Sequence, residues 1–257
     1  MSYIGDKDFL IEVEKGNVVG HSLIHKFGRN ENVGAAYEPL TFGGVYQTPQ
    51  PASATTLRVA AGNANDTAAG SGAREVSFQG LDETGALVTE AVATAGASAS
   101  SATSATFIRL FRAWVSSSGT YGTVSAGSHA ADIVIENGAG GTTWATIDVT
   151  GFPKSQSEIA AYTIPLGKTG YLISYIATTD SNKAVDIFFF KREAILDAAA
   201  PYEAMRLQFE EVGIQGHIAE TFAGAIKFTE LTDIGFLVKA ASPAHVSANF
   251  ELLLVDN

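Results

Sequence analysis

The chain has 257 residues, with 16 Lys and Arg against 27 Asp and Glu, and a formal net charge of −11 at pH 7. This acidic balance argues against nucleic acid as a partner, because the phosphate backbone is itself negatively charged. The chain contains no Cys, which excludes disulfides, thiolate metal sites and thiol nucleophiles.

Neither a signal peptide nor a membrane span is expected. Residues 1–8 are charged and lack an apolar core, and the longest apolar run, residues 250–255, is interrupted by Glu251 and is too short to cross a bilayer. We therefore predict synthesis in the cytoplasm of the producing cell. Charged residues make up only 17% of the chain, which favours a protein that covers much of its surface against neighbours.

Residues 1–56 predict an extended N-terminal arm. Residues 9–13 are compatible with one strand, residues 28–32 have the composition of a turn, and residues 43–51 contain Gly and Pro that are unsuited to a helix. Little periodicity runs through this segment. We expect it to be ordered chiefly by a partner.

Residues 57–152 predict a first β domain. Turn residues at 82–85 and at 138–141 each join two strands into a hairpin, and residues 93–106 are nearly all Ala, Ser, Thr and Gly, which is typical of a loop. Strands are expected at 57–60, 74–81, 86–92, 107–115, 132–136 and 143–149.

Residues 153–257 predict a second domain, a β-sandwich. The domain boundary is placed at Gly151-Phe152-Pro153, because the apolar density rises after it. Residues 185–191 are apolar enough to be a strand buried on both faces, and Pro201 argues against a long helix over residues 193–205. Strands are expected at 161–165, 171–177, 185–191, 206–212, 216–221, 226–228, 232–239 and 246–255. The fold class is therefore all-β, with antiparallel β-sandwich or jelly-roll-like domains.

Two short patterns resemble parts of known ligand sites. Gly167-Lys168-Thr169 matches only the end of a phosphate-binding loop, since position 162 is Tyr and a strand is expected to follow, so a β-turn is favoured. His21 and His25 would share one face of a helix, as zinc ligands often do. Gly residues bracket this pair, which favours a solvent-facing or interface role.

No catalytic constellation is found in the sequence. Gly70-Ser71-Gly72 lacks the spacing of a nucleophile elbow, and Asp66, Asp82 and Glu83 are not part of a calcium-binding ladder. We therefore predict no enzymatic activity, no catalytic or metal-binding residues, and no metal or organic cofactor.

Three aromatic residues are candidates for stacking on a sugar ring. Trp114, Trp144 and Tyr121 each lie within or beside an expected strand. Aromatic rings stack on sugars, but a large apolar side chain in a sandwich more often fills the core. Core packing is the favoured interpretation for all three.

Three segments resemble virion structural proteins of tailed bacteriophages, especially of marine phages. They are GAREVSFQGLD (72–82), FIRLFRA (107–113) and YTIPLGKTGYL (162–172), and the resemblance spans about residues 50–257 without an active-site motif. In size, acidity and Ala/Gly/Thr-rich strand sequence the chain is most similar to capsid decoration, or cement, proteins.

This resemblance implies a homotrimer on the outer capsid surface of the virion. Its partner would be the major capsid protein, and its role would be to stabilise the shell, with the segment 1–56 lying along the capsid lattice. Two alternatives stay open: a neck, tail or fibre-associated component, and a glycan-binding or glycan-cleaving β-sandwich of the tail.

Overall fold

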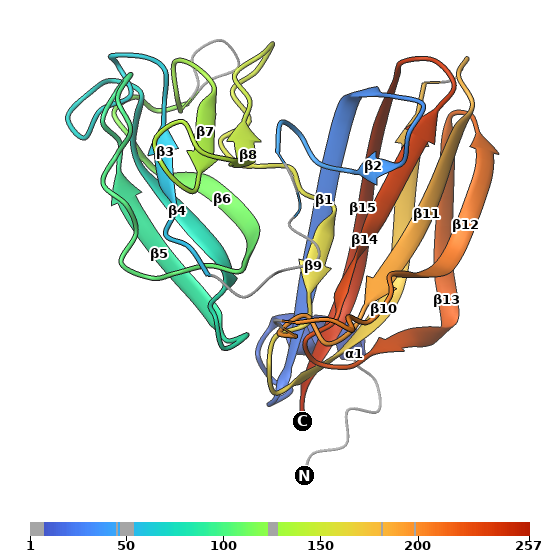
Figure 1. Cartoon of the computed structure of the whole chain (residues 1–257). Coiled ribbons are helices and arrows are strands. Elements are labelled where there is room, and N and C mark those ends of the chain that lie inside the picture. The colour runs from blue at the N-terminus through green and yellow to red at the C-terminus, as the bar shows by residue number, and fades with distance from the viewer. Residues whose placement is uncertain (1–7, 45, 47–53, 123–127, 181, 198) are drawn as a thin grey trace.

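The computed structural model describes residues 8–44, 46, 54–122, 128–180, 182–197 and 199–257 (Figure 1). Within these residues the chain forms four antiparallel sheets and one short helix, α1 (Phe9–Glu14). The strands are β1 (His21–Val33), β2 (Glu38–Pro39), β3 (Arg58–Ala60), β4 (Ala73–Leu81), β5 (Leu87–Ala93), β6 (Arg109–Ser118), β7 (Ile133–Glu136), β8 (Thr143–Ile147), β9 (Ala161–Thr163), β10 (Lys168–Thr179), β11 (Val185–Arg192), β12 (Arg206–Ile214), β13 (His217–Phe228), β14 (Asp233–Ala240) and β15 (Ala244–Asp256). The all-β class expected from the sequence is confirmed.

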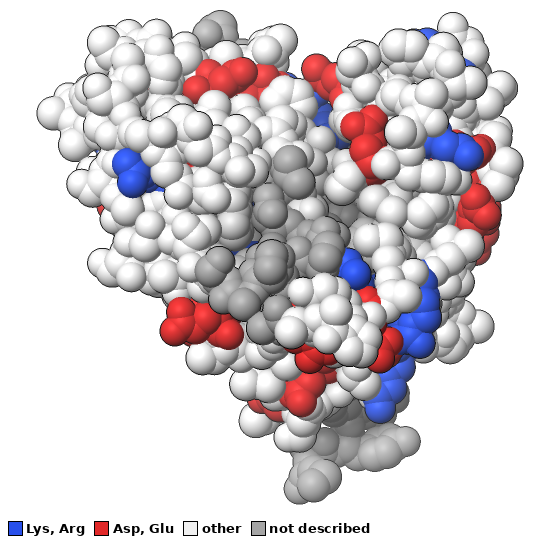
Figure 2. All heavy atoms as spheres, in the orientation of Figure 1, with Lys and Arg blue, Asp and Glu red and all other residues white. Residues whose placement is uncertain are grey.

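The strands are arranged in two lobes that stand side by side (Figure 1). The smaller lobe contains β3 to β8, and the larger lobe contains α1, β1, β2 and β9 to β15. The chain thus begins in the larger lobe, leaves it to form the smaller lobe, and returns at β9. On the face shown in Figure 2, uncharged side chains cover most of the surface, and acidic and basic ones are interspersed among them.

The larger lobe is a sandwich of two sheets. One has the strand order β1-β15-β10-β13, and the other has the order β12-β11-β14-β2, with β9 also paired to β14. Every second residue of β15 from Ala244 to Leu254 is buried, because successive side chains of a strand point to opposite faces. Phe189 lies at the centre of the core, with its ring centroid 5.0 Å from that of Phe236 and 5.5 Å from that of Phe250.

Strand β11 has side chains covered on both faces, as the sequence predicts. Ile187 and Phe189 point into the sandwich core. On the opposite face Phe190 belongs to the apolar cluster of the smaller lobe, and the ring of Phe188 lies 4.4 Å from that of Tyr37. The smaller lobe therefore covers part of the outer face of the larger lobe.

The smaller lobe packs the sheet β3-β7-β8 against the sheet β5-β4-β6. Both predicted hairpins, β4–β5 and β7–β8, are confirmed. In the first, the Asp82 carboxylate accepts hydrogen bonds from the backbone N–H groups of Thr84 (2.8 Å) and Ala86 (3.0 Å). Burial alone would raise the pKa of Asp82, but hydrogen bonds, first among them that of the Thr84 side chain, lower it below its ordinary value.

Residues 9–13 form a helix where the sequence predicts a strand. The side chain of Asp8 accepts hydrogen bonds from the backbone N–H groups of Leu10 (3.0 Å) and Ile11 (3.5 Å), so it is the N-cap of α1. An N-cap carboxylate provides acceptors for helix N–H groups that have no partner within the helix. This single residue outweighs the strand propensity of the apolar residues that follow it.

The predicted turn at residues 28–32 is also wrong, because these residues belong to β1. This strand pairs with β15 from His21 opposite Val255 to Val33 opposite Ala244. Gly28 is required by packing: a Cβ there would lie 2.3 Å from the backbone nitrogen of Ala160. The turn-like composition was therefore misleading, because long-range strand pairing and a close approach of two backbone segments determine the conformation of residues 28–32.

The N-terminal segment consequently differs from the arm expected over residues 1–56. Residues 8–44 pack into the larger lobe through α1, β1 and β2, while residues 45 and 47–53 lie outside the described residues. Residues 153–257 form a sandwich only together with β1 and β2. The boundary at residues 152 and 153, taken as a limit between independent folding units, stays a prediction.

Candidate functional site

The short patterns singled out in the sequence have structural roles. Gly167 has a φ of +77° in a turn over residues 165–168, where the N–H of Lys168 donates to the carbonyl oxygen of Pro165 at 3.2 Å. The turn expected at 167–169 thus lies slightly earlier, and Lys168 and Thr169 begin strand β10. His21 and His25 lie on strand β1, where a separation of four residues corresponds to about 13 Å. They are too far apart for one metal ion. Among the described residues, no group of three or more His, Asp or Glu side chains is placed to hold a metal ion.

Asp66 is a buried structural carboxylate. It accepts hydrogen bonds from the backbone N–H groups of Ala73 (2.8 Å), Ala130 (3.0 Å) and Ala131 (3.2 Å), and it is fully buried. Its oxygens are thus occupied by three loop amides. Glu83 accepts a hydrogen bond from the Thr106 hydroxyl at 2.8 Å. These carboxylates stabilise loops of the smaller lobe.

The three aromatic candidates have different positions. Trp144 is 6% exposed in the core of the smaller lobe, as predicted, whereas the side chain of Tyr121 is 93% exposed. Trp114 is half-buried on the outer face of β6, so the core interpretation is wrong for Tyr121 and Trp114.

In the part of the chain that the structure describes, no helix has the length and apolar character needed to cross a membrane.

A buried ion pair joins the two lobes, and the sequence analysis missed it. Arg109 of β6 donates from Nε to Oδ1 of Asp233 (2.9 Å) and from Nη2 to Oδ2 (2.6 Å), with Asp233 on β14. Both side chains are fully buried. Oδ1 of Asp233 also accepts hydrogen bonds from the hydroxyls of Thr163 (2.5 Å) and Tyr46 (3.1 Å).

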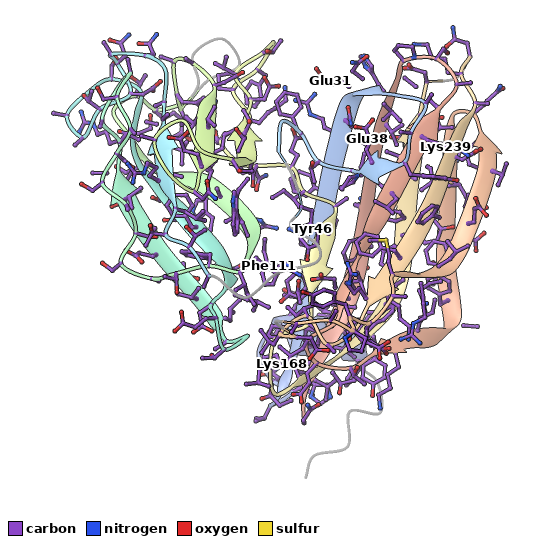
Figure 3. The ribbon with its side chains drawn as sticks, in the orientation of Figure 1. Glu31, Glu38, Tyr46, Phe111, Lys168 and Lys239 are labelled. Carbon is purple, nitrogen blue, oxygen red and sulfur yellow. The ribbon has the colours of Figure 1, made fainter. Side chains whose placement is uncertain are left out.

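The charges at this junction are closely coupled. Burial, followed by the negative charge of Asp233, raises the pKa of Tyr46 well above its ordinary value. Burial alone would lower the pKa of Arg109, but the Asp233 carboxylate raises it. Tyr46 and Phe111 lie between the lobes in Figure 3, and the Phe111 ring centroid is 4.3 Å from that of Tyr162. Polar and apolar contacts together fix the two lobes relative to each other.

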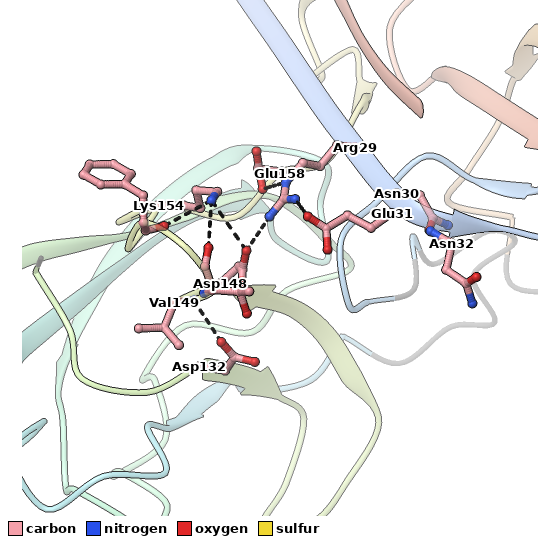
Figure 4. Close-up of polar contacts among 11 residues, drawn as sticks. Arg29, Asn30, Glu31, Asn32, Asp132, Asp148, Val149, Lys154 and Glu158 are labelled. Carbon is pink, nitrogen blue, oxygen red and sulfur yellow. Dashed lines mark hydrogen bonds and ion pairs between the residues drawn. The ribbon is translucent and has the colours of Figure 1, made fainter. Parts of the chain in front are cut away.

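A second cluster of charges joins the lobes nearer the surface (Figure 4). Arg29 of β1 contacts Asp148 and Glu158, each at 2.5 Å, and also pairs with Glu31. Lys154 lies 3.8 Å from Asp148. Burial alone would raise the pKa of Asp148, but hydrogen bonds from Thr150 and Arg29 lower it. The acid is therefore ionised and paired across the junction.

A buried lysine is the third polar contact between the lobes. Lys26 of β1 is 4% exposed, and its Nζ donates a hydrogen bond to the carbonyl oxygen of Phe111. Burial, with a smaller effect of the Arg112 charge, lowers the pKa of Lys26 to about 7. The folded protein thus binds this proton more weakly than the unfolded chain does.

Lys26 predicts a pH dependence of stability. The unfolded chain retains the proton up to a pKa of about 10.4, so the free energy of unfolding should rise by about 1 kcal/mol per pH unit between pH 7 and 9. Urea denaturation at a series of pH values measures this slope. K26M, which carries no titratable group, should be more stable than the wild type at pH 7, and its advantage should shrink toward pH 9. An equal slope in both proteins would contradict the assignment.

The far side of the larger lobe presents an open edge. Strands β12 and β13 are the last strands of their sheets on the side away from the smaller lobe (Figure 1), and most of their residues are exposed or half-buried. We call these two strands, with Met205 directly before them, the β12–β13 edge. The outer backbone groups of both strands are available to a further strand.

The β12–β13 edge is rich in exposed apolar side chains. Of the 13 large hydrophobic side chains that are exposed in the described residues, three lie on this edge: Met205, Leu207 and Val212. Val212 is 68% exposed and Leu207 is 51% exposed. Behind them the ring of Phe209 stacks on those of Tyr175, at 4.8 Å, and Phe189, at 5.1 Å. Exposed apolar residues that lie together over packed core residues mark an interaction surface.

Comparisons with known proteins add little to this geometry. No protein-family model matches the sequence, and no curated protein matches it. Among solved structures, the infectious bursal disease virus Gx strain structure aligns over 91% of this chain and 76% of its own, at 10% identity and a TM-score of 0.23. The VP2 subviral particle of that virus aligns over 98% and 83%, at 10% identity and a TM-score of 0.20. TM-scores this low do not establish a shared fold.

Proposed function

We propose that this chain is a non-enzymatic structural protein of a virion that decorates and stabilises a phage capsid shell. Its partner is the major capsid protein, and it acts as a homotrimer on the outer surface. The β12–β13 edge is the observation that carries this proposal. It offers both unpaired backbone groups and apolar side chains, the two elements by which sheets associate with other chains.

The junction between the lobes supports the same role. A protein that joins neighbouring capsid subunits must hold its contact surfaces at a fixed separation to gain from binding a repeated lattice. The buried pair of Arg109 and Asp233 and the cluster around Arg29 fix one lobe against the other. The β12–β13 edge and the smaller lobe lie on opposite sides of the molecule, so each is free to contact a different neighbour (Figure 1).

The low content of charge fits this role as well. Only 17% of residues are charged, and uncharged side chains cover most of the face in Figure 2. Surface charge keeps a free protein soluble. A surface that is covered by neighbouring subunits does not need to be charged. The net charge of −11 favours an outer position over contact with packaged nucleic acid.

Counting the copies of this chain per virion tests the proposal. Quantitative mass spectrometry of purified virions should find hundreds of copies, because a decoration protein follows the symmetry of the shell. Immunogold labelling should mark the head. About a dozen copies or fewer, or label confined to the neck or tail, would replace the capsid role with that of a neck, tail or fibre component.

A further inference from the structure

The outer face of the smaller lobe has a pocket of about 390 Å³ beside Trp114. Besides Trp114 it is lined by Gln79 of β4, Arg112 of β6, and Lys154 and Gln156 of the segment that leads back to the larger lobe. Its volume is in the range of small-molecule sites. The pocket lies beside the junction, because Arg112 hydrogen-bonds His25 of the larger lobe and Lys154 lies near Asp148 of the Arg29 cluster, and it is separate from the β12–β13 edge.

Strand pairing places these side chains in two adjacent rows. Trp114 is opposite Ser77 on one side and Gln156 on the other, and Gln79 is opposite Arg112. Directly opposed residues of antiparallel strands are close neighbours on one face of the sheet. The indole therefore stands among two amides and a guanidinium, with the small Ser77 beside it.

Three polar groups of the pocket lack protein partners. The side-chain amides of Gln79 and Gln156 and the indole N–H of Trp114 make no hydrogen bond to any residue that the structure describes, although all three side chains are half-buried. Because they are half-buried, these groups are accessible to water and to a ligand that enters the pocket. Each amide supplies both donors and an acceptor, which suits adjacent hydroxyl groups.

The pocket is positively charged in an acidic protein. Arg112 donates from Nη2 to the carbonyl oxygen of His25 at 3.2 Å, and among the described residues it has no carboxylate within ion-pair distance. Lys154 donates to the carbonyl oxygens of Thr150 and Phe152, and the Asp148 carboxylate lies 3.8 Å away. Arg112 is thus free to form a charge-assisted pair with an anionic group.

The wall that carries Gln156 is held rigidly. The N–H of Val115 donates to the carbonyl oxygen of Ser155, and the N–H of Ser157 donates to that of Ala113, both at 2.8 Å. Ser155 has a φ of +63°, a conformation that a residue with a side chain seldom adopts. Strained residues persist where their surroundings enforce them, often at binding sites. The pocket is therefore formed before a ligand enters.

We propose that this pocket binds an acidic pyranose, such as the uronic acid unit of a surface polysaccharide. The apolar C–H face of the sugar packs on the indole of Trp114. Gln79 and Gln156 hydrogen-bond adjacent hydroxyls, and Arg112 binds the sugar carboxylate. This inference does not depend on the capsid role, because it is argued from the residues of the pocket alone.

A titration with two sugars that differ in one group tests the proposal. Methyl β-D-glucuronide should change the tryptophan fluorescence in a saturable way at millimolar concentration, because Trp114 is at the surface while Trp144 is buried. Methyl β-D-glucoside, which lacks the carboxylate, should bind on the order of tenfold more weakly. Raising the salt concentration should reduce this difference.

Variants measured by calorimetry separate the contributions. R112Q should abolish the preference for the glucuronide, and W114A should weaken binding of both sugars by about tenfold or more. The matched control is S116A, which changes an outward-facing residue of the same strand outside the pocket. Equal binding of the two sugars by the wild type, no saturable binding of either, or an equal loss in S116A would overturn the proposal. Circular dichroism of each variant separates a lost site from a lost fold.

Discussion

Replacing Arg109 with Ala is expected to lower the free energy of unfolding by about 3–5 kcal/mol, because the Asp233 carboxylate then stays buried without its partner. Asp233→Ala should have a similar effect, since it leaves the guanidinium uncompensated. Both side chains are fully buried, so water cannot replace the missing group without a change in structure. Denaturation in urea, followed by tryptophan fluorescence, measures the loss.

The double variant R109M/D233L is the control for this prediction. It removes both charges and fills most of the space with apolar atoms, so it should be more stable than either single variant. A decrease of less than about 1 kcal/mol in the free energy of unfolding of both single variants would show that the ion pair is accessible to water, because exposed ion pairs contribute only that much. A double variant no better than the singles would contradict the pairing.

From the proposed capsid role, the variant L207K/V212K is expected to bind capsid shells at least about a hundredfold more weakly than the wild type. Two charges would enter the apolar contact, and binding to a repeated lattice multiplies the loss at each contact. Both side chains are more than half exposed, so the melting temperature should change little. Cosedimentation with undecorated shells measures binding, and sedimentation velocity measures whether the proposed trimer is lost.

Leu87→Lys provides the matched control for the edge prediction. Leu87 is 50% exposed on β5 of the smaller lobe, almost the same fraction as Leu207, but it lies far from the β12–β13 edge. This variant should decorate shells like the wild type. If it binds as weakly as L207K/V212K, the smaller lobe makes the contact. If L207K/V212K binds at full occupancy, the edge has no part in it.

Elements whose structure depends mainly on neighbouring residues could be predicted from the sequence alone. The hairpin at residues 82–85 was predictable because Asp82 and Gly85 suit its turn, and β15 was predictable from its alternation. The N-terminal strand β1 was not, since its partner β15 lies more than 200 residues along the chain. Its Gly and Asn residues indicate a turn unless that partner is known.

The contacts between the two lobes could not be predicted from composition, although the spacing of two arginines gave one indication of them. Arg109 and Arg112 are three residues apart, so simple alternation would place them on opposite faces of a strand, with one of them facing inward. A β-bulge between Leu110 and Arg112 changes this alternation, and both arginines pair with residues of one face of β4, Leu81 and Gln79. A buried arginine requires a buried acid. Its identity, Asp233, followed only from the fold, because 124 residues separate the two. The Trp114 pocket likewise depends on Gln79 and Gln156, which come from two other segments.

The pairing of β1 with β15 has a consequence for the order in which the protein is made. Residues 58–147, which contain all strands of the smaller lobe, leave the ribosome before β9 to β15 are synthesised, so this lobe can fold first. Strand β1 is synthesised before the smaller lobe and must wait for its partner β15, which lies more than 200 residues further along. Such distant pairing slows folding. The larger lobe is thus completed only after β15 has been synthesised, and a chain truncated before β15 has no partner for β1.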